Sequence, residues 1–280
     1  MDKKDFIQLD FANTSVGQNE LLIALLANIG YTGFEEGNIS LKAFIPQVDF
    51  NKEELDAVLL TIPATYTKSI IEDENWNAKW ESSFKPIVVN DFVRRTPWVA
   101  IRAGFHQPVT SAKHEIIITP KMSFGTGHHA TTYLMIEQMG RIDFTGKAVL
   151  DFGTGTGILA ILSEKMGASE INAIDNDDWS ITNAIENITA NDCKRIIIEN
   201  AARIPTKKKF DIILTNINLN VIKDCLGAIS HACKKGAVVL LSGFLLKDEI
   251  SILKELVKNG FRHLATSQKG GWICLRVQKD

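Results

Sequence analysis

Residues 148–160 restrict the fold of this chain more than any other segment. An apolar strand, Ala148 to Phe152, runs into a turn with glycines at positions 153, 155 and 157, and a helix begins at Ile158. Glycines let a backbone turn sharply and approach a ligand closely, and the free N–H groups at a helix N-terminus can meet polar ligand oxygens. The segment therefore predicts a nucleotide-like ligand beside the first strand of an open α/β sheet.

The rest of the chain after this turn alternates strand and helix patterns, which is typical of a parallel sheet covered by helices. We expect strands at 148–152, 170–174, 195–198, 210–214 and 237–241, and helices at 158–166, 179–189, 221–233 and 249–258. Two further strand-like runs, 261–265 and 272–277, follow without a helix between them, so they can pair antiparallel. The predicted fold class is α/β, a doubly wound, mostly parallel sheet with a C-terminal antiparallel hairpin.

The first 75 residues predict a second, smaller domain. Their strand and helix patterns follow the order β-α-β-β-α-β, at 5–11, 20–29, 31–36, 39–45, 52–61 and 65–71. This order is that of a small α+β, ferredoxin-like domain. Trp76, Trp80 and Phe84 then recur at four-residue spacing, which predicts a short helix. We expect a ferredoxin-like substrate-recognition domain at 1–75, a linker helix and connecting strands at 76–120, and the larger domain at 121–280.

Charge divides the chain in two. Residues 1–75 hold five Lys or Arg against thirteen Asp or Glu, a net charge of −8, whereas the other 205 residues hold 26 against 20, a net charge of +6. An acidic domain repels phosphate backbones and attracts basic partners. We therefore expect a basic protein as partner and no direct binding of nucleic acid. The alternative is an acidic surface that is merely solvated.

Composition excludes several other classes of protein. With 45% apolar and 23% charged residues the chain can build a core, and no stretch approaches the roughly 18 apolar residues of a membrane helix. The first residues show no signal peptide, so we expect no membrane contact and a cytoplasmic location. The four cysteines lie far apart and predict reduced thiols. No metal is expected, because His128 and His129 are adjacent and the other histidines have no ligand spacing.

Asp175 ends the second strand of the predicted sheet, 22 residues beyond Gly153. A carboxylate there can accept hydrogen bonds from both hydroxyls of a ribose. Residues 155–160 satisfy the pattern G-x-G-x-x-A, so an NAD-dependent oxidoreductase is one interpretation. The first glycine, however, directly follows Asp151-Phe152 and gives D-x-G-x-G-x-G, which resembles the S-adenosylmethionine motif of class I methyltransferases.

Further motifs carry a closer resemblance. They are Phe124-Gly125-Thr126-Gly127-His128-His129-Ala130-Thr131-Thr132, Asn216-Ile217-Asn218, Leu241-Ser242-Gly243-Phe244 and the linker Trp76-Asn77-Ala78-Lys79-Trp80. Together they resemble the ribosomal protein methyltransferases of the PrmA type over nearly the whole chain. The resemblance implies transfer of methyl groups from S-adenosylmethionine to amino groups, the N-terminal α-amine and lysine ε-amines, of the eleventh protein of the large ribosomal subunit.

The resemblance also implies a set of cofactor-binding residues. Thr132, Gly153, Asp175 and Asn216 correspond to the family's cofactor contacts, and Gly155 belongs to the same loop as Gly153. Thr131 and Thr132 begin an apolar-periodic helix, so a hydroxyl there can cap the helix or reach the methionine carboxylate. Phe124 can cover the cofactor or be a buried aromatic. We expect Thr131, Gly155 and Phe124 among the cofactor-binding residues as well.

Asn216 is the expected catalytic residue. It follows an apolar strand at the carboxyl edge of the sheet, where ligands of open α/β sheets collect. Its amide can accept a hydrogen bond from an amine and help to orient the lone pair. Amino-methylating enzymes often carry N-P-P-Y here, whereas this chain has Asn216-Ile217-Asn218-Leu219. The missing prolines and aromatic residue argue against a flipped base or a glutamine amide as acceptor and favour an aliphatic amine.

Overall fold

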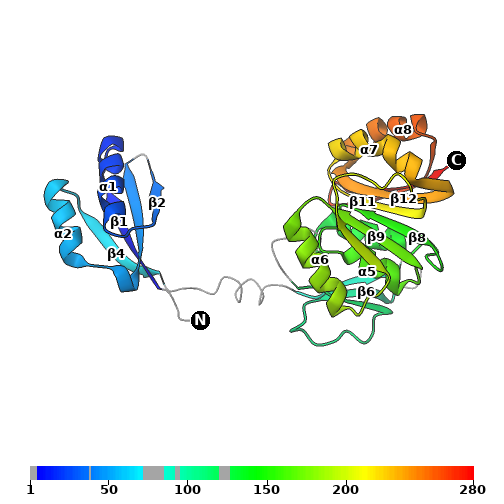
Figure 1. Cartoon of the computed structure of the whole chain (residues 1–280), viewed down its shortest axis with the longest axis horizontal. Helices are drawn as coiled ribbons and strands as arrows, with labels where there is room; N and C mark the ends of the chain where they lie inside the picture. The colour runs from blue at the N-terminus through cyan, green and yellow to red at the C-terminus, as the bar shows by residue number, and fades with distance from the viewer. Residues whose placement is uncertain (1–4, 38, 72–84, 92–94, 120–126) are drawn as a thin grey trace. The chain divides into compact units, whose positions relative to one another are not determined.

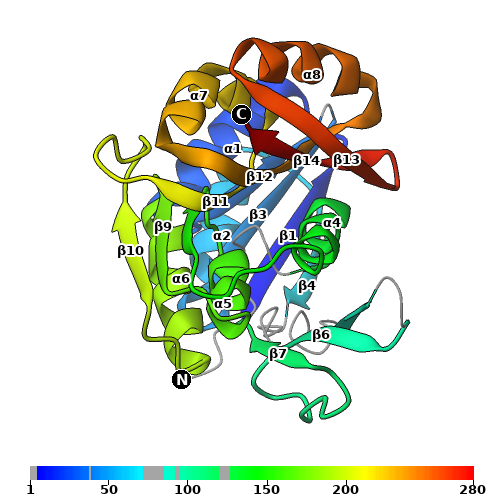
Figure 2. The same ribbon diagram turned by 90° about the vertical axis from the view of Figure 1, so that its right-hand side faces the viewer.

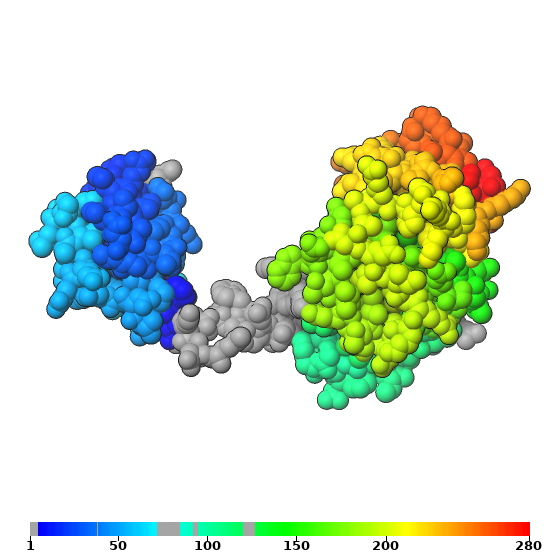
Figure 3. Space-filling view, in the orientation of Figure 1, coloured from blue at the N-terminus to red at the C-terminus, as the bar shows by residue number. Residues whose placement is uncertain are grey.

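The chain folds as two compact units, Met1–Ser83 and Phe84–Asp280. They are coloured from blue to cyan and from turquoise to red in Figures 1 and 3. The computed structural model describes residues 5–37, 39–71, 85–91, 95–119 and 127–280. The predicted linker helix with Trp76, Trp80 and Phe84 lies outside these ranges, and so does Phe124.

The first unit is a four-stranded antiparallel sheet with two helices. Its elements are β1 (Phe6–Ala12), α1 (Val16–Asn28), β2 (Gly33–Glu36), β3 (Ser40–Pro46), the short η1 (Gln47–Asp49), α2 (Lys52–Thr61) and β4 (Tyr66–Ile71). The strand order is β2-β3-β1-β4, and β1 pairs antiparallel with both β3 and β4. This topology confirms the predicted β-α-β-β-α-β order and the ferredoxin-like arrangement.

Side-chain alternation explains the core of this unit. Ile7, Leu9 and Phe11 of β1 are buried and share one face of the strand, where they pack with Leu22 and Leu26 of α1. Helix α1 begins earlier than the sequence pattern predicted. The reason is a capping box, in which the Ser15 hydroxyl accepts from the backbone N–H of Gln18 and the Gln18 side chain accepts from that of Ser15.

The second unit contains a seven-stranded sheet. Its elements are β8 (Ala148–Phe152), α5 (Ile158–Lys165), β9 (Glu170–Asp175), α6 (Asp178–Ala190), β10 (Ile196–Asn200), β11 (Phe210–Asn216), α7 (Leu219–Ala232), β12 (Cys233–Leu245), η2 (Leu246–Asp248), α8 (Glu249–Lys258), β13 (Phe261–Lys269) and β14 (Trp272–Lys279). The strand order is β10-β9-β8-β11-β12-β14-β13, and β14 runs antiparallel to both of its neighbours. The predicted α/β fold class, with its C-terminal antiparallel hairpin, is confirmed.

Helices cover both faces of this sheet. On one face α4 (Ala130–Met139), α5 and α6 contribute to a core that includes Leu134, Leu159 and Val149. On the other face α7 and α8 pack over β11 to β14 (Figure 2). Ile222 and Ile229 of α7 are buried there at helical spacing, so an apolar stripe holds the helix to the sheet.

A separate three-stranded sheet extends the first of these cores. It consists of β5 (Ile87–Asn90), β6 (Pro97–Arg102) and β7 (His114–Ile117), in that order, and Val89, Val99 and Ile116 are buried in it. Arg102, which is almost fully buried, forms an ion pair of 2.9 Å with Glu115 of the neighbouring strand. These short strands fall within the predicted connecting region. Within the described ranges, no helix has the length and apolar character needed to cross a lipid bilayer.

A buried carboxyl group supports the glycine turn. Asp151 of β8 is inaccessible to solvent, and one of its oxygens accepts from the Thr154 hydroxyl (2.7 Å) and from the Ala160 backbone N–H (3.2 Å). The other oxygen has no hydrogen-bond partner among the described residues. Burial raises the pKa of this carboxyl to about 7, because loss of hydration outweighs the two hydrogen bonds, and the negative charge of Asp175 adds to the rise.

This raised pKa predicts a pH-dependent stability. The folded chain holds the Asp151 proton more tightly than the unfolded chain does. Protonation of this carboxyl therefore stabilises the fold below about pH 4, and this stabilisation is lost as the pH rises through about 7. The side chain in Asp151→Asn stays neutral, so the free energy of unfolding of this variant should fall less between these pH values than that of the unchanged chain. The expected difference is a few kcal/mol, because each pKa unit corresponds to about 1.4 kcal/mol. Urea unfolding at several pH values measures the difference, and parallel curves for the two chains would contradict it.

Candidate functional site

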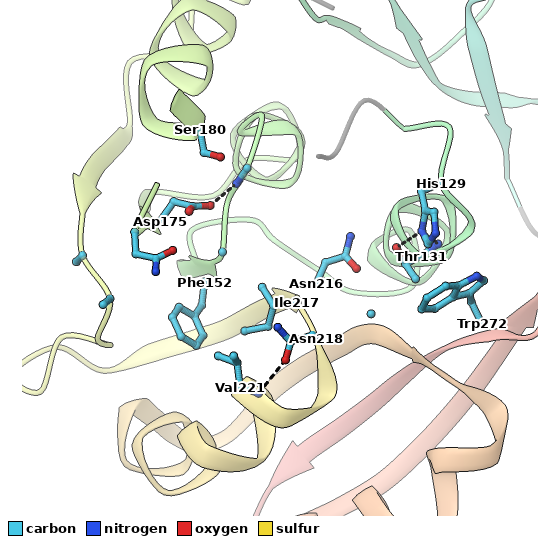
Figure 4. Close-up of a pocket in the computed structure, with 16 residues that line it drawn as sticks. His129, Thr131, Phe152, Asp175, Ser180, Asn216, Ile217, Asn218, Val221 and Trp272 are labelled. Carbon is cyan, nitrogen blue, oxygen red and sulfur yellow. Dashed lines mark hydrogen bonds between the residues drawn. The ribbon is translucent and has the colours of Figure 1, made fainter. Parts of the chain in front are cut away.

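A cavity of about 550 Å³ opens at the carboxyl edge of the larger sheet. It lies where the strand order reverses, because β9 and β10 are on one side of β8 and β11 and β12 are on the other. The residues that line it are His129, Thr131, Phe152, Gly153, Gly155, Asp175, Asn176, Ser180, Ala201, Ala202, Asn216, Ile217, Asn218, Val221, Gly243 and Trp272. Asp175 and Ser180 lie at one end, and His129, Thr131 and Trp272 lie at the other (Figure 4).

The glycine turn forms one wall of this cavity. The backbone N–H groups of Gly153 and Thr154 both donate to the carbonyl of Ile174, at 2.9 and 3.0 Å, which ties the turn to the end of β9. Asn187 of α6 donates to the carbonyl of Thr156 at 2.8 Å and holds the turn from behind. The side chains of Thr154 and Thr156 are buried, so these residues belong to the scaffold of the turn.

Asp175 links the turn to the next helix. One carboxylate oxygen accepts from the Gly155 backbone N–H at 2.9 Å, and the other accepts from the Asp177 backbone N–H at 3.1 Å. Asp177 caps α6 by accepting from the N–H of Ser180. Each oxygen of Asp175 keeps acceptor capacity for a ligand hydroxyl, because a carboxylate oxygen can accept two hydrogen bonds.

The opposite end of the cavity is built at the N-terminus of α4. The N-cap is His129, whose Nδ1 accepts from the backbone N–H of Thr131 at 3.3 Å and lies 2.8 Å from the Thr131 hydroxyl. Of the two roles expected for a threonine hydroxyl at this terminus, capping of the helix is therefore excluded, since Thr131 and Thr132 lie inside its first turn, where both are buried. The ring of Trp272 stands edge-on to His129, with 4.8 Å between ring centroids.

Asn216 lies between these two ends, where β11 stops (Figure 4). Only 9% of the residue is exposed, and its amide nitrogen donates to the hydroxyl of Thr132 at 3.3 Å. Its amide oxygen is buried and has no hydrogen-bond partner among the described residues. An unpaired buried carbonyl is costly, so this oxygen is suited to accept from a donor that arrives with a ligand.

Most of the predicted site residues come together in this cavity. Asn216, Gly153, Asp175, Thr131 and Gly155 line it, and Thr132 contacts it through its hydrogen bond to Asn216. Phe124 lies outside the described residues.

Several residues that line the cavity were not predicted from the sequence. His129, Gly243 and Trp272 are the clearest cases, and all three belong to segments distant in sequence from the glycine turn. His129 and Gly243 each stand in a motif that carried the family resemblance, which is the signal that points to them. Nothing local marks Trp272, because only the pairing of β14 with β12 brings it to the cavity.

Comparisons with known proteins agree with this geometry. The sequence profile of the family described as "Ribosomal protein L11 methyltransferase (PrmA)" matches residues 23–280. The ribosomal protein L11 methyltransferase of Porphyromonas gingivalis is 39% identical over 270 residues, which cover 93% of this chain and 91% of that protein. The enzyme of the same name from Bacteroides fragilis is 36% identical over 266 residues, with 92% and 93% covered.

Among solved structures, the ribosomal protein L11 methylase of Lactobacillus delbrueckii subsp. bulgaricus is similar to this chain. Its TM-score is 0.62 at 29% identity, and the match covers 69% of this chain and 100% of that one. The NAD-dependent oxidoreductase, which the turn alone left open, finds no support in these similarities. The chain belongs to the ribosomal protein L11 methyltransferase family and is an S-adenosylmethionine-dependent methyltransferase.

Proposed function

We propose that this chain methylates amino groups of ribosomal protein L11, both the N-terminal α-amine and lysine ε-amines. The names of its relatives support the substrate. One observation in the structure supports an amine as acceptor, namely the buried, unpaired amide oxygen of Asn216 in the middle of the cavity. An amine has N–H groups, and the Asn216 oxygen can accept a hydrogen bond from one of them while the lone pair of the amine nitrogen points away from this oxygen.

The cavity has room for a ligand of the size of S-adenosylmethionine. Its volume of about 550 Å³ lies in the usual range for sites of drug-sized ligands. We assign Asp175 to the ribose hydroxyls and the turn at Gly153 and Gly155 to close backbone contact with the cofactor. Thr131 and Thr132, in the first turn of α4, would face its carboxylate, where the helix N-terminus also favours negative charge. When bound, the cofactor supplies a methyl group on a positively charged sulfur.

The acceptor must be a neutral amine, because a protonated amine has no lone pair. An unperturbed lysine has a pKa of about 10.4, so neutralising it at pH 7 costs about 4 to 5 kcal/mol, whereas an α-amine near 8 costs about 1 kcal/mol. Much of the cavity wall is apolar, with Phe152, Ile217 and Trp272 among its residues. An amine that enters this apolar part of the cavity loses hydration, which disfavours its charged form. We therefore propose that desolvation lowers the pKa of the amine and that water takes the proton.

We further propose that residues 1–75 form the domain that recognises the substrate. The net charge of −8 on these residues complements a basic ribosomal protein and disfavours direct contact with RNA. Exposed acidic residues on α2, namely Glu53, Glu54 and Asp56, contribute to this charge. Because the proposed substrate is a ribosomal protein, we place the reaction in the cytoplasm.

The substrate assignment is tested by labelling. The purified chain is incubated with radiolabelled S-adenosylmethionine and the separated proteins of the large ribosomal subunit, and label should appear on L11. Acetylation of the L11 N-terminus should remove the part of the label that belongs to the α-amine. Label on another protein, with L11 unlabelled, would show that the substrate assignment is wrong.

The role of the acidic domain can be read in the same assay. Its buried residues form a core separate from those of the larger unit, so removal of residues 1–75 leaves the larger cores intact. Binding of S-adenosylmethionine should then remain while labelling of intact L11 is lost. Full labelling by the shortened chain would place substrate recognition elsewhere.

Asp175→Ala should weaken the affinity for S-adenosylmethionine by about 10- to 100-fold. Each charge-assisted hydrogen bond to the ribose contributes on the order of 1.5 to 3 kcal/mol, and the tie to Gly155 is lost as well. Isothermal titration calorimetry measures the change. Asp178→Ala is the matched control, because this nearby carboxylate is exposed, bonds to Asn200 and does not line the cavity. Equal affinities of the two variants would remove Asp175 from the cofactor site.

Asn216→Ala should lower kcat for methylation of L11 by about 10- to 100-fold, through loss of the hydrogen bond that orients the amine. The affinity for S-adenosylmethionine should fall less than kcat, and the melting temperature should stay close to that of the unchanged chain. Steady-state kinetics with saturating cofactor separates the two effects. Normal turnover would exclude Asn216 from the reaction.

A further inference from the structure

Ile217 is enclosed by two glycines, Gly153 in the turn after β8 and Gly243 in β12. A Cβ atom on Gly153 would lie 2.2 Å from Cγ2 of Ile217. A Cβ atom on Gly243 would lie 2.0 Å from the carbonyl oxygen of Ile217 and 2.7 Å from its carbonyl carbon. The side chain of Ile217 therefore contacts the glycine turn after β8, and its backbone contacts β12.

Gly243 reaches this position through an irregularity in β12. The pairing of β12 with β14 shifts register between Ser242 and Phe244, and Gly243 has a φ of +100°, a conformation that other residues rarely adopt. The Ser242 hydroxyl donates to the carbonyl of Ile273 at 2.7 Å, next to the cavity residue Trp272. The bulge thus brings the backbone of β12 against Ile217 and anchors the opposite wall of the cavity.

The connection that carries Ile217 is short and leads directly to the acceptor site. Strand β11 ends at Asn216 and helix α7 begins at Leu219, so Ile217 and Asn218 alone join them. Asn218 caps α7 by accepting from the Val221 N–H at 3.1 Å, which fixes the far end of the connection. Asn216, Ile217 and Asn218 all line the cavity (Figure 4). Any shift of the Ile217 backbone therefore displaces Asn216.

We propose that Gly243 and Ile217 are positioning residues for methyl transfer, an inference that rests on the proposed role of Asn216. Gly243 packs against the Ile217 peptide and holds the Ile217 side chain in contact with Gly153. This contact sets the distance between the Asn216 amide and the glycine turn. Proline would fix such a connection through its ring. This chain has no proline between Asn216 and Leu219, and the connection is held instead by packing of Ile217 against Gly153 and Gly243.

The first test compares two glycines of β12 that share a left-handed backbone. Gly236 has a φ of +75° and nothing within 4 Å of its Cβ position, so Gly236→Ala introduces backbone strain alone. Gly243→Ala adds the collision with Ile217. A shift of about 1 Å at reacting groups costs about 100-fold in rate, so kcat should fall about 100-fold below that of Gly236→Ala. The Kd for S-adenosylmethionine should differ less than tenfold between them. Equal kcat values would overturn the proposal.

The second test uses the side-chain contact and decides the question even if Gly243→Ala does not fold. Gly153→Ala collides with Cγ2 of Ile217, an atom that Ile217→Ala removes. Ile217→Ala alone should lower kcat, because it removes the side chain that sets the position of Asn216. The double variant should nevertheless show a recovery, with kcat at least about tenfold above the value expected from the product of the two single effects. Ile217→Ala should give no recovery to Gly243→Ala, whose collision is with backbone atoms. Failure of the first recovery, or equal recovery of both glycine variants, would contradict the enclosure of Ile217.

A third measurement needs no acceptor protein. In crystal structures of Gly243→Ala and Gly236→Ala, Asn216 should be displaced relative to Gly153 in the first and unmoved in the second. Superimposable Asn216 side chains would overturn the proposal. An unchanged chain that fails to label L11 would instead contradict the proposed substrate and leave this structural result standing.

Discussion

The cavity depends on a backbone turn that two carboxyl groups hold in place. Asp151 accepts from Thr154 and Ala160 beneath the turn, and Asp175 accepts from Gly155 beside it. The turn needs left-handed backbone at Gly153, where φ is +76°, a conformation that glycine adopts without steric cost. The two acidic side chains, together with the carbonyl of Ile174, give the turn its shape through contacts within the protein. A ligand therefore meets a wall that is already organised, which reduces the entropy it must lose on binding.

The residues of the site that could be predicted from the sequence are those whose positions follow from short segments and from the strand order. Gly153, Gly155 and Asp175 lie within one β-α-β segment, and Asn216 ends an apolar strand, so strand order alone brings them to the same edge of the sheet. Gly243 and Trp272 reach the cavity through the register of β12 with β14, including a bulge, and no short sequence pattern specifies that register. The same limit applies to the ends of elements. Helix α8 has the predicted bounds, whereas α1 begins earlier because of its capping box.

The start of α4 shows how burial overrides a local preference. Serine, threonine, aspartate and asparagine are the usual N-caps, and the sequence offers two threonines close together. Both are fully buried, and their hydroxyls meet other side chains, Thr131 at His129 and Thr132 at Asn216. The imidazole of His129 takes the capping role instead, one residue before the helix. The threonines thus connect the helix terminus to the acceptor residue, a role that capping statistics do not reveal.

The same arrangement bears on how an amine loses its proton. Nδ1 of His129 accepts from the Thr131 N–H, so this nitrogen is engaged at the terminus of α4. Asp175 is the only carboxylate among the described residues that line the cavity, and it lies at the end opposite His129 (Figure 4). Asn216 is a neutral amide that can orient an amine and cannot take its proton. The proposed loss of the proton to water fits this set of described lining residues and favours the acceptor that is easiest to neutralise, the α-amine. Lysine side chains then become acceptors to the extent that the apolar wall around Ile217 lowers their pKa.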